Sequence, residues 1–312
     1  MIFVTLHGGK PGKAPHKNNV HAYDRAGKKI TPCVLDDIEG VILDELRGVH
    51  LSGKYLYVVN AHDTQNSVFS FRGSDTSYQF AGKFVSRETC KSVLHPFDLT
   101  FDGAGYCYLS SQDTNVVTRL KVSKDGTTGT AAPIALALRG HGHFLPGTFV
   151  ASSVGNLSEL PATAFPGPAG LQYSRRGKKK HSVRGVLWTN NALYVADEPA
   201  GRVKVYDGTG KFLGQSSQVE SPVHLIAHMG SLYVSGANHV FSAKLAKPAG
   251  DFILSAIPGL KIKNGCGMAF TSSGHFYIAS RTENRILKFD SKFKPMRFKC
   301  TLPDNPEFLL HV

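Results

Sequence analysis

Histidine and carboxylate side chains stand at the starts of short apolar segments, where they are placed for proton transfer. His95 and Asp98 flank Pro96-Phe97, and His224 closely follows Pro222. An imidazole titrates near neutral pH, and a carboxylate beside it can set its tautomer. We therefore predict His95, Asp98 and His224 as the catalytic residues of a general acid–base site.

A structural interpretation of Asp98 and His224 stays open beside the catalytic one. Asp98 stands where the corresponding segments have Val49, Val186 or Met268, so it is a carboxylate in an apolar column and needs a partner. If both side chains are buried between strands and paired with backbone groups, their substitution costs stability and removes no chemistry.

Two arginines open equivalent Arg-Gly-Val segments, at Arg47 and Arg184. A guanidinium pairs bidentately with a carboxylate or a phosphate, so we predict that both arginines bind a small anionic substrate. His141 and His143, in the segment Arg-Gly-His-Gly-His, are further candidates for substrate binding. We expect the arginines to share one pocket with Asp98 and His224, although inheritance within a repeat explains the arginines equally well.

Metal binding is a further prediction. Glu307 and His62 are expected on the same face as the other candidates, and carboxylates and neutral imidazoles suit divalent ions. A divalent metal ion is therefore a candidate cofactor of unknown identity. The sequence contains no His-Glu-x-x-His, Gly-x-Ser-x-Gly or Walker motif.

An internal repeat of short strands must position these residues. The clearest copy runs through residues 184–188 (RGVLW), 193–197 (LYVAD) and 202–207 (RVKVYD), and further copies begin at Arg47, Pro96, Pro222 and Cys266. A sixth copy joins residues 306–309 to residues 1–6 and 20–24. The pattern predicts an all-β, six-bladed β-propeller of four-stranded antiparallel blades, closed by pairing of the N- and C-terminal strands.

One spacing in the repeat is abnormal. Pro96 and Arg184 are 88 residues apart, about twice the other steps. We therefore predict one propeller domain over residues 1–312, with a long loop insertion at about residues 135–181 between the third and fourth blades. The insertion ends in a basic cluster, residues 175–181 (RRGKKKH), and we expect it to overhang the face where ligands bind.

Composition limits the class and setting of the protein. The 32 glycines, 10% aromatic and 19% charged residues are typical of a turn-rich globular chain. No apolar run is long enough to cross a bilayer, and the five dispersed cysteines form no Cys-x-x-Cys pair, so we expect a cytoplasmic monomer without membrane insertion. The net charge of +13 favours anionic partners: a small molecule, an acidic protein or RNA.

The repeat resembles NHL-repeat propellers, whose blades combine a Pro-x-Gly-Ile start, a Leu-Tyr-Val-Ala-Asp strand and an Asp-x-x-Gly turn. Residues 184–210 are the nearest match. The resemblance implies the fold, and its members include sugar lactonases, virginiamycin-type lyases and RNA-binding modules. Lactonases carry Asn or Asp after the blade-opening proline, where this chain has Phe97 and Val223, so their metal site is not expected to transfer intact.

Three functional classes remain. The first is a lyase or hydrolase acting on a small anionic substrate, with or without a metal ion. The alternative is a non-catalytic binding module that takes an acidic partner or RNA through a basic face. The third is a structural interaction protein that uses the blade surfaces without chemistry.

Overall fold

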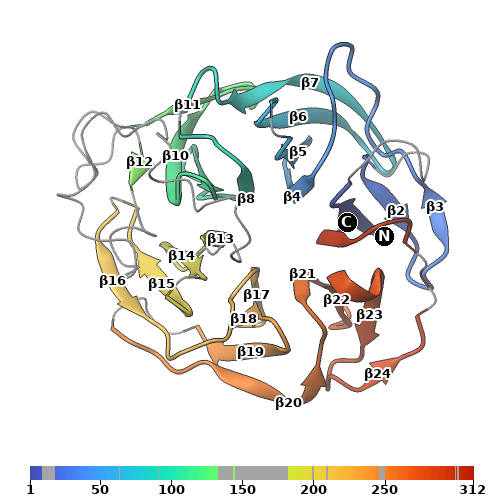
Figure 1. The fold of residues 1–312 in the computed structure, drawn as a ribbon, viewed down its shortest axis with the longest axis vertical. Helices are drawn as coiled ribbons and strands as arrows, with labels where there is room; N and C mark the ends of the chain where they lie inside the picture. The colour runs from blue at the N-terminus through green and yellow to red at the C-terminus, as the bar shows by residue number, and fades with distance from the viewer. Residues whose placement is uncertain are drawn as a thin grey trace.

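Six β-sheets form a ring in the computed structural model (Figure 1). The model describes residues 1–8, 18–62, 64–90, 92–132, 143–144, 182–198, 200–208, 210–245, 250–298, 300 and 302–312. Each sheet is an antiparallel blade built on four strands, the first at the centre of the ring and the last at its rim, and one of the six carries a short fifth strand. The predicted six-bladed propeller is confirmed.

The strands of each blade follow one another from the centre outwards. Blade 1 contains β25 (Pro306–His311), β1 (Ile2–Leu6), β2 (His21–Tyr23) and β3 (Lys29–Thr31). Blade 2 contains β4 (Leu46–Ser52), β5 (Tyr55–Asn60), β6 (Ser67–Ser74) and β7 (Ser77–Ser86). Blade 3 contains β8 (Pro96–Phe101), β9 (Tyr106–Ser111), β10 (Val116–Val122) and β11 (Gly129–Ala131), and the short β12 (His143–Phe144) also pairs with β10.

The second half of the ring repeats this order. Blade 4 contains β13 (Val183–Thr189), β14 (Ala192–Asp197), β15 (Arg202–Tyr206) and β16 (Phe212–Gln215). Blade 5 contains β17 (Leu225–His228), β18 (Ser231–Ser235), β19 (His239–Lys244) and β20 (Ser255–Lys261). Blade 6 contains β21 (Gly265–Phe270), β22 (Phe276–Ser280), β23 (Arg285–Phe289) and β24 (Pro295–Met296), with the 3-10 turn η2 (Arg281–Glu283) between β22 and β23. No helix in the described part of the chain is long and apolar enough to cross a membrane.

Both ends of the chain contribute to blade 1. The C-terminal strand β25 pairs antiparallel with the N-terminal β1, with Ile2 opposite His311 and Phe3 opposite Leu310. The two termini therefore lie side by side (Figure 1). This pairing confirms the predicted closure and gives the inner edge of β1 a partner strand.

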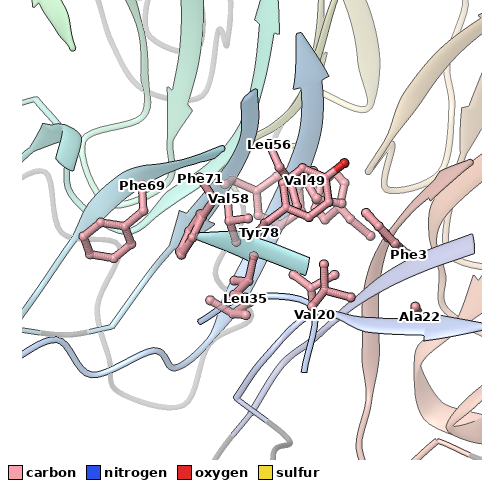
Figure 2. Packing of buried hydrophobic residues seen from close by; sticks show 14 residues of the cluster. Phe3, Val20, Ala22, Leu35, Val49, Leu56, Val58, Phe69, Phe71 and Tyr78 are labelled. Atoms are coloured by element: carbon pink, nitrogen blue, oxygen red, sulfur yellow. The ribbon is translucent and has the colours of Figure 1, made fainter. Parts of the chain in front are cut away.

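The core lies between neighbouring blades. The middle strands β1 and β5 are buried along their whole length, because both faces of a blade pack against other blades. Between blades 1 and 2, for example, Phe3, Val49 and Tyr78 pack into one cluster (Figure 2). Strands buried on both faces need continuous apolar runs, which explains why the Leu-Tyr-Val segments were readable in the sequence.

The predicted insertion at residues 135–181 lies outside the described residues, apart from the two residues of β12. The substrate-binding candidate His141 and the basic cluster at residues 175–181 fall there. His143 is placed only through its backbone, opposite Thr118 of β10.

Candidate functional site

A β-bulge recurs near the start of the innermost strand in five of the six blades. The register shifts between Leu46 and Val49 in β4, and at the matching places in β8, β13, β21 and β25. A bulge adds one residue to a strand and re-aims its side chains. The residues that enter each bulge are Arg47, Phe97, Arg184, Cys266 and Glu307.

All of these bulge residues except Glu307 line a cavity of about 480 Å³, here called the mouth cavity. Arg47, Arg184 and Arg281 supply three guanidinium groups to its wall. Its other lining residues include the imidazoles of His7 and His95, the carboxylates of Glu45 and Glu198, and the apolar side chains of Phe97, Val223, Ala237 and Cys266.

Glu307 is fully buried beside this cavity. Its Oε1 lies 2.5 Å from Nη1 of Arg47 and 2.6 Å from Nη2 of Arg281, and its Oε2 accepts a weak hydrogen bond from the Cys266 thiol at 3.6 Å. Burial alone would raise the pKa of Glu307, but the two guanidinium groups and His7 outweigh it and lower that pKa to about 2. Glu307 is therefore ionised and holds two arginines in place.

His7 stands between the arginines and this carboxylate. Its Nδ1 lies 2.6 Å from Nη1 of Arg47 and 3.1 Å from Oε1 of Glu307. A guanidinium only donates, so the first contact needs an unprotonated Nδ1, whereas the second needs a protonated one. The two contacts therefore need different protonation states of the same nitrogen, so only one of them can be a hydrogen bond at a time.

The remaining charges of the mouth cavity are also paired. Arg184 Nε lies 2.6 Å from Oε2 of Glu198, and its guanidinium lies 5.2 Å from the centre of the Phe97 ring. His95 has Glu45 at 3.4 Å from Nε2 and Asp113 at 3.9 Å from Nδ1. A carboxylate therefore lies on each side of the His95 ring.

Four residues of the mouth cavity adopt the left-handed backbone conformation although none is glycine. Glu45, His95, Ser221 and Asn264 have φ angles of 48°, 51°, 46° and 50°. Each precedes the innermost strand of its blade. Such conformations cost free energy for residues with a Cβ, and they concentrate at ligand-binding and active sites.

The structure divides the predicted site residues between two places. Arg47, Arg184 and His95 line the mouth cavity, and Glu307 lies directly behind its arginines. Asp98 and His224 instead line a second cavity of about 340 Å³, here called the lower cavity, further along the innermost strands. The prediction that the two arginines share one pocket with Asp98 and His224 is therefore wrong.

The cause of this correction is the bulge. The strand ladders align Val49 with Leu99, Val186 and Met268, so Asp98 corresponds to Gly48, Gly185 and Gly267 and not to the valines. The extra residue shifts Asp98 away from the mouth cavity, a shift that the amino-acid pattern alone did not show.

Asp98 and His224 connect each blade to the next through backbone groups. Asp98 accepts the N–H groups of Leu99 and Val186, at 2.8 and 3.0 Å. Nδ1 of His224 accepts the N–H of Met268 at 3.0 Å. Burial raises the pKa of Asp98 to about 8 and lowers the pKa of His224 to about 3. These contacts are the ones expected from the structural interpretation.

The structure does not support the metal role predicted for Glu307 and His62. Two guanidinium groups occupy the space beside the Glu307 carboxylate that a cation would need. Nδ1 of His62 instead accepts the backbone N–H of Thr64, in the loop after β5. Within the described ranges, no group of three or more His, Cys, Asp or Glu side chains is arranged to hold a metal ion.

Sequence reasoning left several mouth residues out of the predicted site. His7, Glu198 and Arg281 each follow the second strand of a blade, namely β1, β14 and β22. The ends of these strands are therefore a sequence signal for residues of the mouth cavity. Glu45 lies in a loop without a recognisable motif. Its contact with Arg47 and His95 depends on a left-handed turn that nothing in the local sequence indicates.

Comparisons with known proteins support the fold. No family model and no curated protein matches this chain. A functionally unknown protein from Desulfotomaculum acetoxidans DSM 771 is similar in structure, with 12% identity, a TM-score of 0.57, and 99% of this chain and 88% of that chain covered. A proposed 6-phosphogluconolactonase from Bacteroides uniformis ATCC 8492 shares 10% identity at a TM-score of 0.56, covering 95% and 80%.

A chain of a nidogen/laminin complex is similar as well, with 11% identity, a TM-score of 0.55, and 99% of this chain and 96% of that chain covered. At these identities the likenesses show a shared propeller fold and nothing about activity.

Proposed function

We propose that the mouth cavity binds a small anionic molecule and acts on it as a lyase or hydrolase. The observation that carries the proposal is the convergence of Arg47, Arg184 and Arg281 with two imidazoles on one cavity of about 480 Å³. Cavities with a few convergent polar groups on an otherwise apolar wall are the usual form of small-molecule sites.

Arg281 is the group best placed to receive the anion. Its side chain is 36% exposed, whereas that of Arg47 is 6% exposed, and Glu307 holds one of its Nη atoms at 2.6 Å. An arginine that is already oriented loses little side-chain entropy when it binds a carboxylate or phosphate. Phe97 and Val223 supply an apolar surface for the rest of the ligand.

His95 and His7 are the proposed proton carriers. Glu45 lies 3.4 Å from Nε2 of His95 and Asp113 lies 3.9 Å from its Nδ1, and His7 lies between Arg47 and Glu307. Asp98 and His224 have no part in this proposal, because they line the lower cavity. Cleavage of an anionic ester or lactone fits these groups, and the lactonase named for the Bacteroides neighbour would act on such an anion.

A thermal shift assay with benzoate and with its neutral analogue benzyl alcohol tests the binding step. We expect benzoate to raise the melting temperature of the protein and benzyl alcohol to leave it unchanged. Arg281→Met should abolish the benzoate shift. Arg285→Met is the matched control, because Arg285 pairs with Glu283 on the surface, away from the mouth cavity, and should keep the shift. Equal shifts by both compounds would contradict the proposal.

Turnover of mono(4-nitrophenyl) succinate, an anionic ester, tests the chemical step. We expect His95→Gln to lower kcat at least tenfold with a small change in KM, since general acid–base catalysis contributes about 10²–10⁴-fold. Arg281→Met should mainly raise KM. Hydrolysis that is unaffected by either substitution would assign the reaction to another part of the chain.

A further inference from the structure

The lower cavity lies at the other end of the innermost strands from the mouth cavity. Its volume is about 340 Å³, and every blade contributes residues to its lining through its innermost strand. The residues that matter here are Asp98, Trp188, His224, His228 and Phe270.

An aromatic plug separates the two cavities. Phe308 is buried, and its ring centre lies 4.9 Å from that of His224 and 5.3 Å from that of Phe97. Phe97 faces the mouth cavity and His224 faces the lower cavity, so the plug lies between them. A ligand of the lower cavity is therefore distinct from the anion proposed for the mouth cavity.

Asp98 is a buried carboxylate without a counter-ion. The residue is 5% exposed, and its two oxygens accept only the backbone N–H groups of Leu99 and Val186. No Lys, Arg or His side chain among the described residues forms an ion pair with it. A buried charge that lacks a partner is costly, and a cationic ligand would supply that partner.

The walls of the lower cavity suit an organic cation. Trp188 stacks on Tyr108 with ring centres 5.2 Å apart, and His228 stacks on Phe270 at 4.1 Å. Aromatic faces attract ammonium groups through their quadrupoles. His224 accepts the N–H of Met268 through Nδ1, so the proton of its neutral imidazole is on Nε2. That N–H can donate to an oxygen on the ligand.

We propose that the lower cavity binds a small primary amine in its ammonium form, with Asp98 as the counter-ion and the Trp188 side of the cavity in contact with its apolar part. The amine chemistry follows from the unpaired carboxylate, and the size limit follows from the cavity volume.

The titration of the surrounding groups supports a simple pH dependence. Burial raises the pKa of Asp98 to about 8, and it lowers the pKa of His50 to about 4 and of His224 to about 3. The pKa values of His228 and His311 are also lowered by burial. Between pH 6 and 8, therefore, Asp98 changes charge while His50 and His224 stay neutral. Its ionised fraction rises roughly 50-fold over that range, and an aliphatic amine stays protonated throughout.

Trp188 allows a direct test, because it is the single tryptophan of the chain and lines this cavity. We would titrate the full-length protein with phenethylammonium chloride and follow tryptophan fluorescence. We expect a saturable change whose apparent affinity tightens by more than tenfold from pH 6 to pH 8. The neutral analogue 2-phenylethanol should give no saturable change at the same concentrations.

Two substitutions keep the test decisive. Asp98→Asn preserves the size of the side chain and should abolish the response to phenethylammonium. Ala227→Phe fills the cavity from its exposed rim without touching the Asp98 hydrogen bonds, and it should abolish binding even if Asp98→Asn fails to fold. Ala26→Phe, in an exposed turn of blade 1, is the matched control and should bind normally.

Three outcomes would overturn the proposal: no saturable change with phenethylammonium, an equal response to 2-phenylethanol, or binding that survives Ala227→Phe. The first would leave Asp98 as a purely structural link between blades 3 and 4. The others would show binding by apolar contact or at another site.

Discussion

Glu307 is the residue on which the mouth cavity most depends. It is fully buried, and it holds Arg47 and Arg281 on one oxygen. Removing one partner of a buried ion pair costs more than the pair contributes, because the other charge is left without compensation. Removing the Glu307 carboxylate would leave the guanidinium groups of both Arg47 and Arg281 without that compensation. The same contacts that prepare the arginines for an anion therefore also stabilise the closing blade.

We expect Glu307→Gln to destabilise the protein at pH 7 by about 3–5 kcal/mol. The pKa of Glu307 is lowered from 4.5 to about 2, so its contribution is complete above pH 4.5 and is lost as the pH falls towards 2. This lowering corresponds to about 3 kcal/mol. Urea unfolding at pH 7 and pH 3 would measure the free energy of unfolding of the wild type and of the variant. The difference between these two free energies should be smaller at pH 3 than at pH 7.

Glu88→Gln is the control for this substitution. Glu88 pairs with Lys83 at 3.4 Å but its side chain is 80% exposed, so its removal should change stability little at either pH. A variant of Glu307 as stable as the Glu88 control would show that the buried ion pairs contribute nothing to folding.

At the scale of the element, the innermost strands alternate between glycine and a large side chain around the ring. Gly48, Gly185 and Gly267 lie in blades 2, 4 and 6, and the corresponding positions in blades 3, 5 and 1 hold Asp98, His224 and Phe308. Each glycine lies against the large residue of the next blade. The glycines therefore make room for Phe308, which lies between the two cavities, and for Asp98 and His224, which line the lower cavity.

Gly267→Ala tests this close approach. A Cβ at Gly267 would lie 2.4 Å from Cα of Phe308 and 2.6 Å from the backbone nitrogen of Leu309, so the strands would have to separate. We expect a loss of about 3 kcal/mol in stability, typical of severe overpacking. Thermal unfolding measures it. Gly53→Ala, in an open turn with φ of +58°, should lose only about 1 kcal/mol.

The strands and their order were predictable from the sequence, because double-sided burial leaves uninterrupted apolar runs such as residues 193–197. The bulges were not predictable, because they are set by how each innermost strand meets the next blade. This is why the sequence pattern did not show that Asp98 lines a different cavity from Arg47, Arg184 and His95. The pairing of Glu307 with two arginines brings together residues far apart in the sequence, which no local pattern records.

The whole molecule is a ring held shut by one ladder between chain ends. Pairing of β25 with β1 joins residues about 300 positions apart, and Phe308 also fills the centre of the ring. Deleting residues 308–312 would remove both the ladder and the plug. We expect the deletion variant to melt at least 10 °C below wild type in circular dichroism. An unchanged melting temperature would mean that the closing strand is dispensable.

Net charge also acts at the scale of the molecule. The chain carries 36 Lys and Arg against 23 Asp and Glu, and the densest group is the basic cluster at residues 175–181, outside the described residues. In the described mouth cavity, by contrast, each arginine is paired with a glutamate. A polyanion such as RNA would therefore be attracted mainly by the basic cluster and the dispersed surface charges, and a small anion by the mouth cavity.

Replacing Arg175, Arg176, Lys178, Lys179 and Lys180 by glutamine tests whether the cluster binds polyanions. We expect binding of a 12-nucleotide oligouridine, measured by fluorescence anisotropy, to weaken and to become less dependent on salt. Each phosphate contact contributes about 0.7 to the logarithmic salt dependence for a single strand, so the slope should fall by up to about 3.5. The control removes the same charge from exposed positions outside the cluster, Lys28, Lys29, Lys292, Lys294 and Arg297. An equal loss of affinity for oligouridine in both variants would mean that the overall charge, and not the cluster, attracts the polyanion. Binding that does not depend on salt would exclude phosphate contacts.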